Sequence, residues 1–86
     1  MTNLEGRVAL VTGSARGIGY AIAETLARAK ARVIISDINK DDVDTAVQSL
    51  KDQGYDVLGI PCNVTSEESV NQAVEQIKNE AGPVEI

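Results

Sequence analysis

The chain has 86 residues, so it can form one small domain, and hydrophobic residues make up 43% of it, which suffices for a core. Histidine is absent and Cys62 is the only cysteine, which excludes Ser-His-Asp and Cys-His catalytic sites and the usual zinc sites. The net charge of −5 argues against nucleic acid and anionic membrane surfaces as partners.

The first predicted elements are a strand over residues 7–12 and a helix over about residues 17–30. The strand is apolar without alternation, which is typical of a strand covered on both faces. The helix carries apolar residues at helical spacing, and we expect this face to pack on the core. The face consists of Ile18, Ala21, Ile22, Thr25, Leu26 and Ala29.

A second strand is predicted over residues 32–37 and a second helix over about residues 40–53. Asn39 stands in the N-cap position of this helix, and Gly54 follows directly after its end. Acidic residues near the helix start suit the helix dipole and indicate a solvated face rather than a cation site. The predicted buried stripe is Val43, Ala46, Val47 and Leu50.

A third strand over about residues 56–61 precedes a third helix that ends at Gly82. Thr65 and Glu68 have the spacing of a capping box at the start of this helix. Residues 84–86 resemble the opening of a fourth strand. The predicted buried face of the third helix is Val70, Ala73, Val74, Ile77 and Ala81.

The alternation of strands and helices predicts an α/β fold. Right-handed crossovers between parallel strands give a doubly wound, Rossmann-type sheet with strand order 3-2-1-4. The first two helices should cover one face and the third helix the other. We expect residues 1–86 to be the N-terminal β-α-β-α-β-α-(β) portion of a dinucleotide-binding domain, truncated within the fourth strand. Such a chain is a piece of a longer enzyme or is completed by another polypeptide.

The turn after the first strand contains Gly13, Gly17 and Gly19, and Asp37 follows at the end of the next strand. Glycines permit a tight turn close to a pyrophosphate, the helix N-terminus attracts the anion, and the acid accepts hydrogen bonds from a ribose diol. This arrangement predicts a dinucleotide site. The alternative is that the glycines serve only the turn and helix packing. The phosphate loop of nucleoside-triphosphatases is excluded because no lysine follows Gly17.

Two residues bear on the choice of dinucleotide. The Asp37 carboxylate binds a ribose diol and repels a 2′-phosphate, which favours NAD, whereas the Arg16 guanidinium suits the 2′-phosphate of NADP. We expect NAD, with NADP as the less favoured cofactor.

Residues 12–19, Thr-Gly-Ser-Ala-Arg-Gly-Ile-Gly, resemble the TGxxxGIG signature of the short-chain dehydrogenases/reductases. Residues 62–65 resemble the segment of that family that borders the adenine, and residues 4–11 resemble its first strand. Within the family the chain is most similar to the β-ketoacyl-acyl-carrier-protein reductases. The resemblance implies an NAD(P)-dependent oxidoreductase that acts on a small carbonyl or acyl-thioester substrate and forms a homo-oligomer.

The resemblance also implies roles for ten residues. The pyrophosphate and adenosine ribose would be surrounded by Gly13, Ser14, Arg16, Gly17, Ile18 and Gly19. Asp37 would bind the ribose diol and Ile38 would pack beside the adenine. Asn63, where aspartate is commoner, would accept a hydrogen bond from the adenine amino group through its amide oxygen, and Val64 would line the pocket.

The resemblance implies that catalysis depends on a catalytic serine and a Tyr-x-x-x-Lys pair, both in the part of the family that follows the segment matched here. The 86 residues contain no Tyr-x-x-x-Lys pattern. Glu24 stands four residues after Tyr20, and Gly59 stands four residues after Tyr55, so both tyrosines are interpreted as packing residues. We therefore assign no catalytic residue and expect the chain alone to be inactive. The alternatives are a non-catalytic nucleotide-binding module and an interaction protein that recruits a partner strand.

The sequence also bears on location. A lone cysteine forms no internal disulfide, which fits a reducing compartment. No signal pattern precedes the first strand, and no apolar run reaches the roughly 20 residues needed to span a bilayer. These features predict a cytoplasmic protein without a membrane partner.

Overall fold

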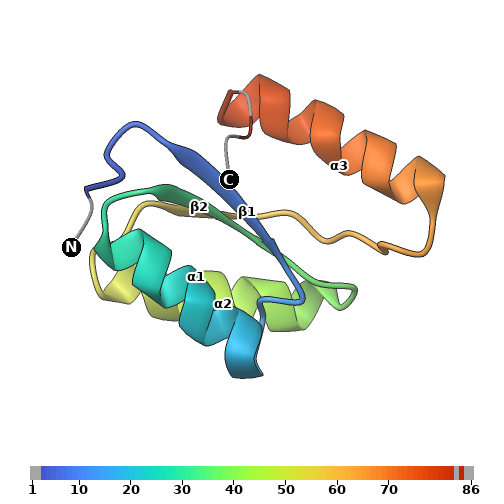
Figure 1. Cartoon of the computed structure of the whole chain (residues 1–86). Helices are drawn as coiled ribbons and strands as arrows, with labels where there is room; N and C mark the ends of the chain where they lie inside the picture. Colours follow the sequence, from blue (N-terminus) through green and yellow to red (C-terminus); the bar gives the residue numbers. More distant parts are fainter. Residues whose placement is uncertain (1–2, 83, 85–86) are drawn as a thin grey trace.

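A computed structural model describes residues 3–82 and residue 84. Strands and helices alternate along the chain (Figure 1). The elements are β1 (Val8–Thr12), α1 (Gly17–Arg28), β2 (Arg32–Ser36), α2 (Lys40–Asp52), β3 (Val57–Gly59) and α3 (Glu67–Glu80). Each lies within the range that the sequence predicts. The expected fourth strand falls largely outside the described residues, since only Val84 of its residues is described.

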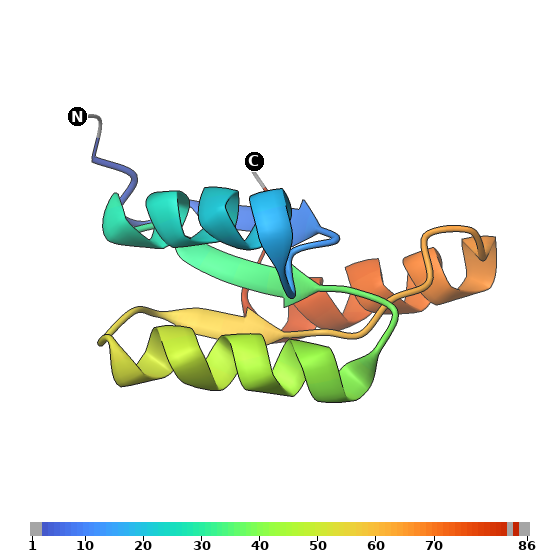
Figure 2. The ribbon, with the colours of Figure 1, turned by 90° about the horizontal axis from the view of Figure 1, so that it is seen from below.

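The three strands form one parallel sheet in the order β1-β2-β3 (Figure 2). The register places Leu10 of β1 opposite Ile34 of β2, and Ile34 opposite Leu58 of β3. This order confirms the predicted doubly wound arrangement for the first three strands. Within the described part of the chain, β2 is the only strand paired with β1, so β1 forms an edge of the sheet.

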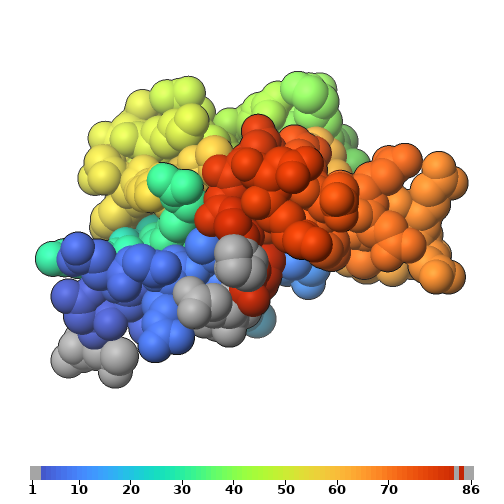
Figure 3. Space-filling view, turned by 90° about the horizontal axis from the view of Figure 1, so that it is seen from above, coloured from blue at the N-terminus to red at the C-terminus, as the bar shows by residue number. Residues whose placement is uncertain are grey.

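Helices cover both faces of the sheet, as predicted. Helices α1 and α2 lie on one face and α3 lies on the other (Figures 1 and 2). The core under α1 and α2 consists of Ala9, Ala23, Ala27, Ala31, Val33, Ile35, Val43, Ala46, Leu50 and Val57. The smaller core under α3 consists of Val8, Ile34, Ile60, Ala73 and Ile77. In the space-filling view, α3 forms a ridge over its face of the molecule (Figure 3).

The helix caps are partly as predicted. The Asn39 side chain accepts a hydrogen bond from the Asp42 N–H at 3.1 Å, which confirms it as the N-cap of α2. Gly54 follows α2 with a φ of +90°, as a residue just past a helix end requires. The N-cap of α3 is Ser66 rather than the predicted Thr65. The physical reason is that the Thr65 hydroxyl donates to the Asn63 side chain instead.

The buried face of α1 differs from the predicted one. Ile18 is 81% exposed and Ile22 is 48% exposed, whereas Ala23 and Ala27 are buried. Ala23 and Ala27 face the sheet, and Gly19, on the same side of the helix, faces the backbone of the turn before α1, because small residues let the helix backbone approach closely. Of the predicted face, Ala29 is buried and Leu26 is half-buried, whereas Ile18 and Ile22 stay on the outer flank of the helix.

The buried face of α3 is narrower than predicted. Ala73 and Ile77 are buried, but Val74 is 41% exposed. A helix packed on a sheet by only one of its sides leaves the flanking position to solvent.

Across residues 3–82 and 84, the helices lack the combination of length and apolar character that a membrane crossing requires.

Candidate functional site

The turn between β1 and α1 lies at the carboxyl ends of β1 and β2. The Ser14 N–H donates to the Ser36 carbonyl oxygen at 3.0 Å, which ties the turn to the last residue of β2. The Ala15 N–H donates to the Asp37 carboxylate at 3.3 Å. The structure therefore brings together the glycine-rich turn and the acid that the sequence placed at the same site.

Backbone geometry explains the glycines of this turn. Gly13 and Gly17 have φ values of +62° and +66°, in the left-handed region that favours glycine. Gly19 has a different role, because a Cβ at this position would collide with the Gly13 carbonyl group, whose carbon would lie 2.9 Å away. The first turn of α1 thus packs directly against the backbone of the glycine-rich turn.

The N-terminus of α1 offers free backbone donors. Arg16 is the N-cap, its side chain makes no capping hydrogen bond, and the first turn contains no acidic residue. Within the described part of the chain, no group accepts a hydrogen bond from the N–H of Gly17, Ile18 or Gly19. By contrast, α2 and α3 are capped by side chains and carry acids in their first turns. These donors and the helix dipole suit an anion such as a pyrophosphate.

Ser14 lies beneath the turn rather than on its surface. Its side chain is fully buried, and its hydroxyl donates to the Val11 carbonyl at 2.6 Å and accepts from the Ser36 N–H at 3.0 Å. The hydroxyl is therefore used to hold the turn, and only the Ser14 backbone borders the anion-binding end of α1. Sequence reasoning did not identify Ser36, although a hydroxyl that ends an apolar strand is the signal that marks it.

Asp37 is half-buried beside the turn. Its Oδ1 accepts from the Ile38 N–H at 2.9 Å and its Oδ2 accepts from the Ala15 N–H, so each oxygen keeps a further lone pair for a ligand. The Arg16 side chain is 84% exposed and approaches only the Asp42 carboxylate, at 4.0 Å. Asp37 is thus fixed in place, whereas Arg16 extends into solvent.

The turn after β3 lies next to Asp37. The Cys62 N–H donates to the Asp37 carbonyl at 2.9 Å, which places Asn63 and Val64 at the same edge of the sheet. Val64 is 61% exposed and Ile38 is 67% exposed, so both leave apolar surface beside polar groups. A flat, weakly polar ring that covered these side chains would be stabilised by the burial of that surface.

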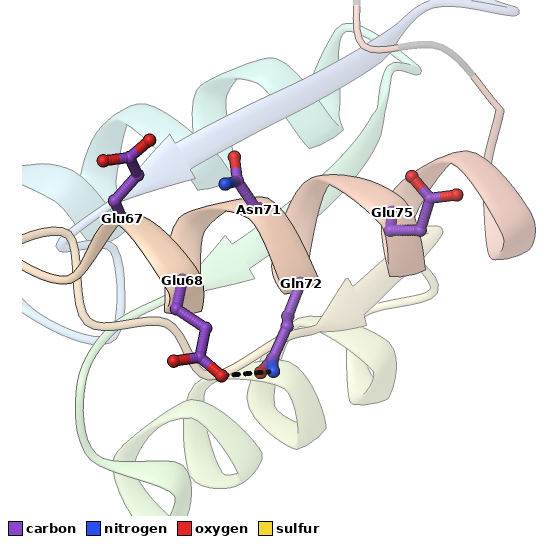
Figure 4. A pocket seen from close by; sticks show the side chains of 5 residues that line it. All are labelled: Glu67, Glu68, Asn71, Gln72 and Glu75. Carbon is purple, nitrogen blue, oxygen red and sulfur yellow. Dashed lines mark hydrogen bonds between the residues drawn. The ribbon is translucent and has the colours of Figure 1, made fainter.

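A hollow lies on the outer face of α3, the helix that follows the turn of Asn63 and Val64. Its lining is acidic and polar, as the close-up shows (Figure 4). The lining residues are Glu67, Glu68, Asn71, Gln72 and Glu75. Three carboxylates repel an anionic ligand, so this hollow is a solvated helix face rather than a dinucleotide site.

Both tyrosines have the packing role that the sequence predicts. Tyr20 and Tyr55 are half-buried against the core under α1 and α2. The Tyr20 hydroxyl is hydrogen-bonded to the Ser49 hydroxyl at 2.9 Å, which joins α1 to α2. Tyr20 directly follows the residues with free backbone donors, but its own N–H donates to the Arg16 carbonyl at 3.4 Å.

Comparison with known proteins agrees with this geometry. Residues 7–86 match the family model described as short chain dehydrogenase. The chain is 37% identical over 84 residues to 5-keto-D-gluconate 5-reductase of Escherichia coli strain K12, covering 98% of this chain and 33% of that protein.

Solved structures agree as well. The crystal structure of 2-keto-3-deoxy-D-gluconate dehydrogenase from Streptococcus agalactiae superposes with a TM-score of 0.90 at 38% identity, covering 96% of this chain and 31% of that one. The crystal structure of hydroxysteroid dehydrogenase from Escherichia coli gives a TM-score of 0.93 at 34% identity, and the match covers 96% of this chain and 35% of that one. The chain thus spans about a third of the length of these relatives. On its sequence and its fold, the chain belongs to the short-chain dehydrogenase family.

Proposed function

We propose that this chain is the NAD-binding part of an oxidoreductase that moves a hydride between nicotinamide and a carbonyl or alcohol substrate. The observation that carries the proposal is the uncapped N-terminus of α1, whose free N–H groups lie beside a turn that is hydrogen-bonded to Asp37. Anion-binding donors and a diol-binding carboxylate are the two groups that a dinucleotide needs. Family membership supports a cofactor of the NAD(P) type.

The preference for NAD rests on Asp37 and Arg16. Asp37 is held by two backbone N–H groups, so it presents a fixed negative charge where a 2′-phosphate would lie. Arg16 is exposed and lies near Asp42, whose carboxylate offsets its charge. The proposed order of affinity is therefore NAD above NADP.

The remainder of the proposed enzyme would supply the reacting groups. The sequence contains no Tyr-x-x-x-Lys pair, and the chain spans about a third of its relatives. Among residues 3–82 and 84, one edge of β1 has no paired strand and α1 has an exposed apolar flank, and further polypeptide would pack on these two surfaces. We propose that residues 1–86 form a half-domain of a longer, oligomeric enzyme.

The substrate class is proposed from the relatives' names. Two of the similar proteins are named for keto-gluconate substrates, which favours a polyhydroxylated carbonyl compound over an acyl thioester. Kinetic comparison of a keto-sugar acid with an acyl thioester, using the enzyme that contains these residues, separates the two classes.

Two alternative functions are compatible with the same surfaces. A non-catalytic nucleotide-binding module would bind NAD without any turnover, even when the rest of a longer chain is present. An interaction protein would recruit a strand at the β1 edge and bind no dinucleotide. Titration with NAD distinguishes the interaction protein from the other two.

The experiment that tests the proposal is calorimetric titration of the chain with NAD and NADP, for the wild type, D37S and D41S. Asp37→Ser removes the diol-binding carboxylate, and we expect it to lower NAD affinity at least about tenfold. The ratio of NAD affinity to NADP affinity should fall as well. Asp41→Ser removes an exposed carboxylate of the neighbouring helix start and should change NAD affinity less than about twofold. Equal effects of the two substitutions would contradict the assigned role of Asp37.

A further inference from the structure

We infer that Asn63 presents a hydrogen-bond donor, not an acceptor, to the base of the bound dinucleotide, so that this chain does not select for the 6-amino group of adenine. The inference rests on the proposed function. It concerns a site residue whose side-chain oxygen accepts two hydrogen bonds from Thr65 in its own turn. It reverses the polarity that the sequence alone assigns to Asn63.

The amide oxygen of Asn63 is fully used. Oδ1 accepts from the Thr65 N–H at 3.0 Å and from the Thr65 hydroxyl at 2.6 Å. A carbonyl oxygen has two lone pairs, so these two hydrogen bonds leave no lone pair for the amino group of a base. An adenine amino group at Asn63 would thus find no acceptor on this side chain.

The orientation of the Asn63 amide follows from its partners. The Thr65 backbone N–H is only a donor, so the atom that faces it must be the oxygen. A rotated amide would set an NH₂ group against this N–H. The same turn fixes the backbone, because the Asn63 N–H donates to the Ser69 hydroxyl at 2.9 Å.

The amide NH₂ of Asn63 is therefore the group that is free. Within the described residues, no acceptor is hydrogen-bonded to it. Asn63 follows Cys62, whose N–H donates to the Asp37 carbonyl at 2.9 Å, so the two turns that carry the exposed apolar residues Ile38 and Val64 meet at this edge of the sheet, in the proposed base pocket. A donor at this place pairs with a ring nitrogen or a 6-oxo group of a purine, but not with a 6-amino group.

The test compares NAD with the NAD analogue in which hydrogen replaces the adenine 6-amino group. Calorimetric titration gives the ratio of the two dissociation constants for the wild type, N63D and N71D. We expect the wild type to bind both within about twofold. Asn63→Asp keeps one oxygen for Thr65 and adds a second as acceptor, so NAD should become tighter than the analogue by about tenfold. Asn71→Asp adds the same charge on the outer face of α3 and should leave the ratio unchanged.

Each outcome is decisive. A wild-type chain that binds NAD at least fivefold tighter than the analogue contradicts the inference, whatever the variants do, so the result stands even if N63D does not fold. An unchanged ratio in a folded N63D also contradicts it. A wild type that binds neither compound overturns the proposed function itself, which is a different result from binding with the opposite selectivity.

Discussion

Ser14 shows how much of the candidate site depends on a hydroxyl that is buried beneath it. Its buried hydroxyl connects Val11 of β1 to Ser36 of β2, and the next residue, Ala15, holds Asp37. The glycine-rich turn and the Asp37 carboxylate, which we propose to bind the pyrophosphate and the ribose diol, therefore share one hydrogen-bond network. Because buried networks are costly to leave incomplete, the position of Asp37 depends on Ser14.

The first prediction concerns this hydroxyl. Ser14→Ala removes the acceptor of the buried Ser36 N–H, and we expect the free energy of unfolding to fall by about 1–3 kcal/mol. Ser49→Ala removes an exposed hydroxyl that bonds Tyr20 and should cost less than about 0.5 kcal/mol. Urea denaturation of both variants measures the difference. Equal losses would show that the Ser14 network contributes nothing beyond an exposed hydrogen bond.

The second prediction separates stability from binding at two glycines. Gly19→Ala sets a methyl group against the Gly13 backbone, so we expect it to cost about 1–3 kcal/mol and to lower NAD affinity at least about tenfold. Gly54→Ala introduces a side chain at positive φ in open space and should cost about 1–2 kcal/mol.

The two glycine variants differ in the binding measurement. Gly54 lies past the end of α2, away from the turn, so NAD affinity in G54A should stay within about twofold of the wild type. Calorimetric titration of both folded variants checks this. A folded G19A that binds NAD like the wild type would contradict the packing role assigned to Gly19.

Most residues of the site are identifiable from the sequence because glycines and an acid at fixed spacing have few other uses. The sequence did not predict in which direction the side chains of these residues point. The Ser14 hydroxyl and the Asn63 oxygen form local hydrogen bonds that depend on Ser36 and Thr65, and no periodicity reports them. Spacing therefore predicted the turns that the structure brings together, and the structure shows which of their atoms remain free of hydrogen bonds within the described residues.

Helix α1 shows the corresponding limit at the level of elements. Its large aliphatic residues form the most apolar stripe, yet the residues buried on the sheet are the small Ala23 and Ala27, and Gly19 packs on the turn before the helix. Hydrophobicity alone favoured the wrong flank, because it does not measure how closely a helix must approach a sheet. In α2 the residues Val43, Ala46 and Leu50 are both apolar and buried against the sheet, so the predicted buried stripe of that helix is confirmed.

The third prediction tests the orientation of α1. Ala23→Leu forces a large side chain between helix and sheet, and we expect it to cost about 1–3 kcal/mol. Ile22→Gln changes a side chain that is 48% exposed and should alter the free energy of unfolding by less than about 0.5 kcal/mol. Urea denaturation of the two variants shows which side of α1 packs on the sheet. The opposite ranking would place the aliphatic stripe against the core.

The fold as a whole was the most predictable level. Apolar strands without alternation require cover on both faces, and crossovers between parallel strands have one handedness, so few topologies were compatible with the pattern. The observed order β1-β2-β3, with α3 opposite α1 and α2, confirms that reasoning for the described residues. The neighbour of β1 was not testable, because the predicted fourth strand falls largely outside them.

All of the proposed roles depend on the turn from Gly13 to Gly19 and Asp37 together holding a dinucleotide. The most direct test is to follow the backbone amide signals of the ¹⁵N-labelled chain by NMR as NADH is added. We expect the largest shifts at Gly17, Ile18 and Gly19, whose N–H groups are free, with a second group at residues 37–38 and 63–64. Saturating NADH that leaves these signals unmoved, or that shifts only residues elsewhere, would contradict the claim.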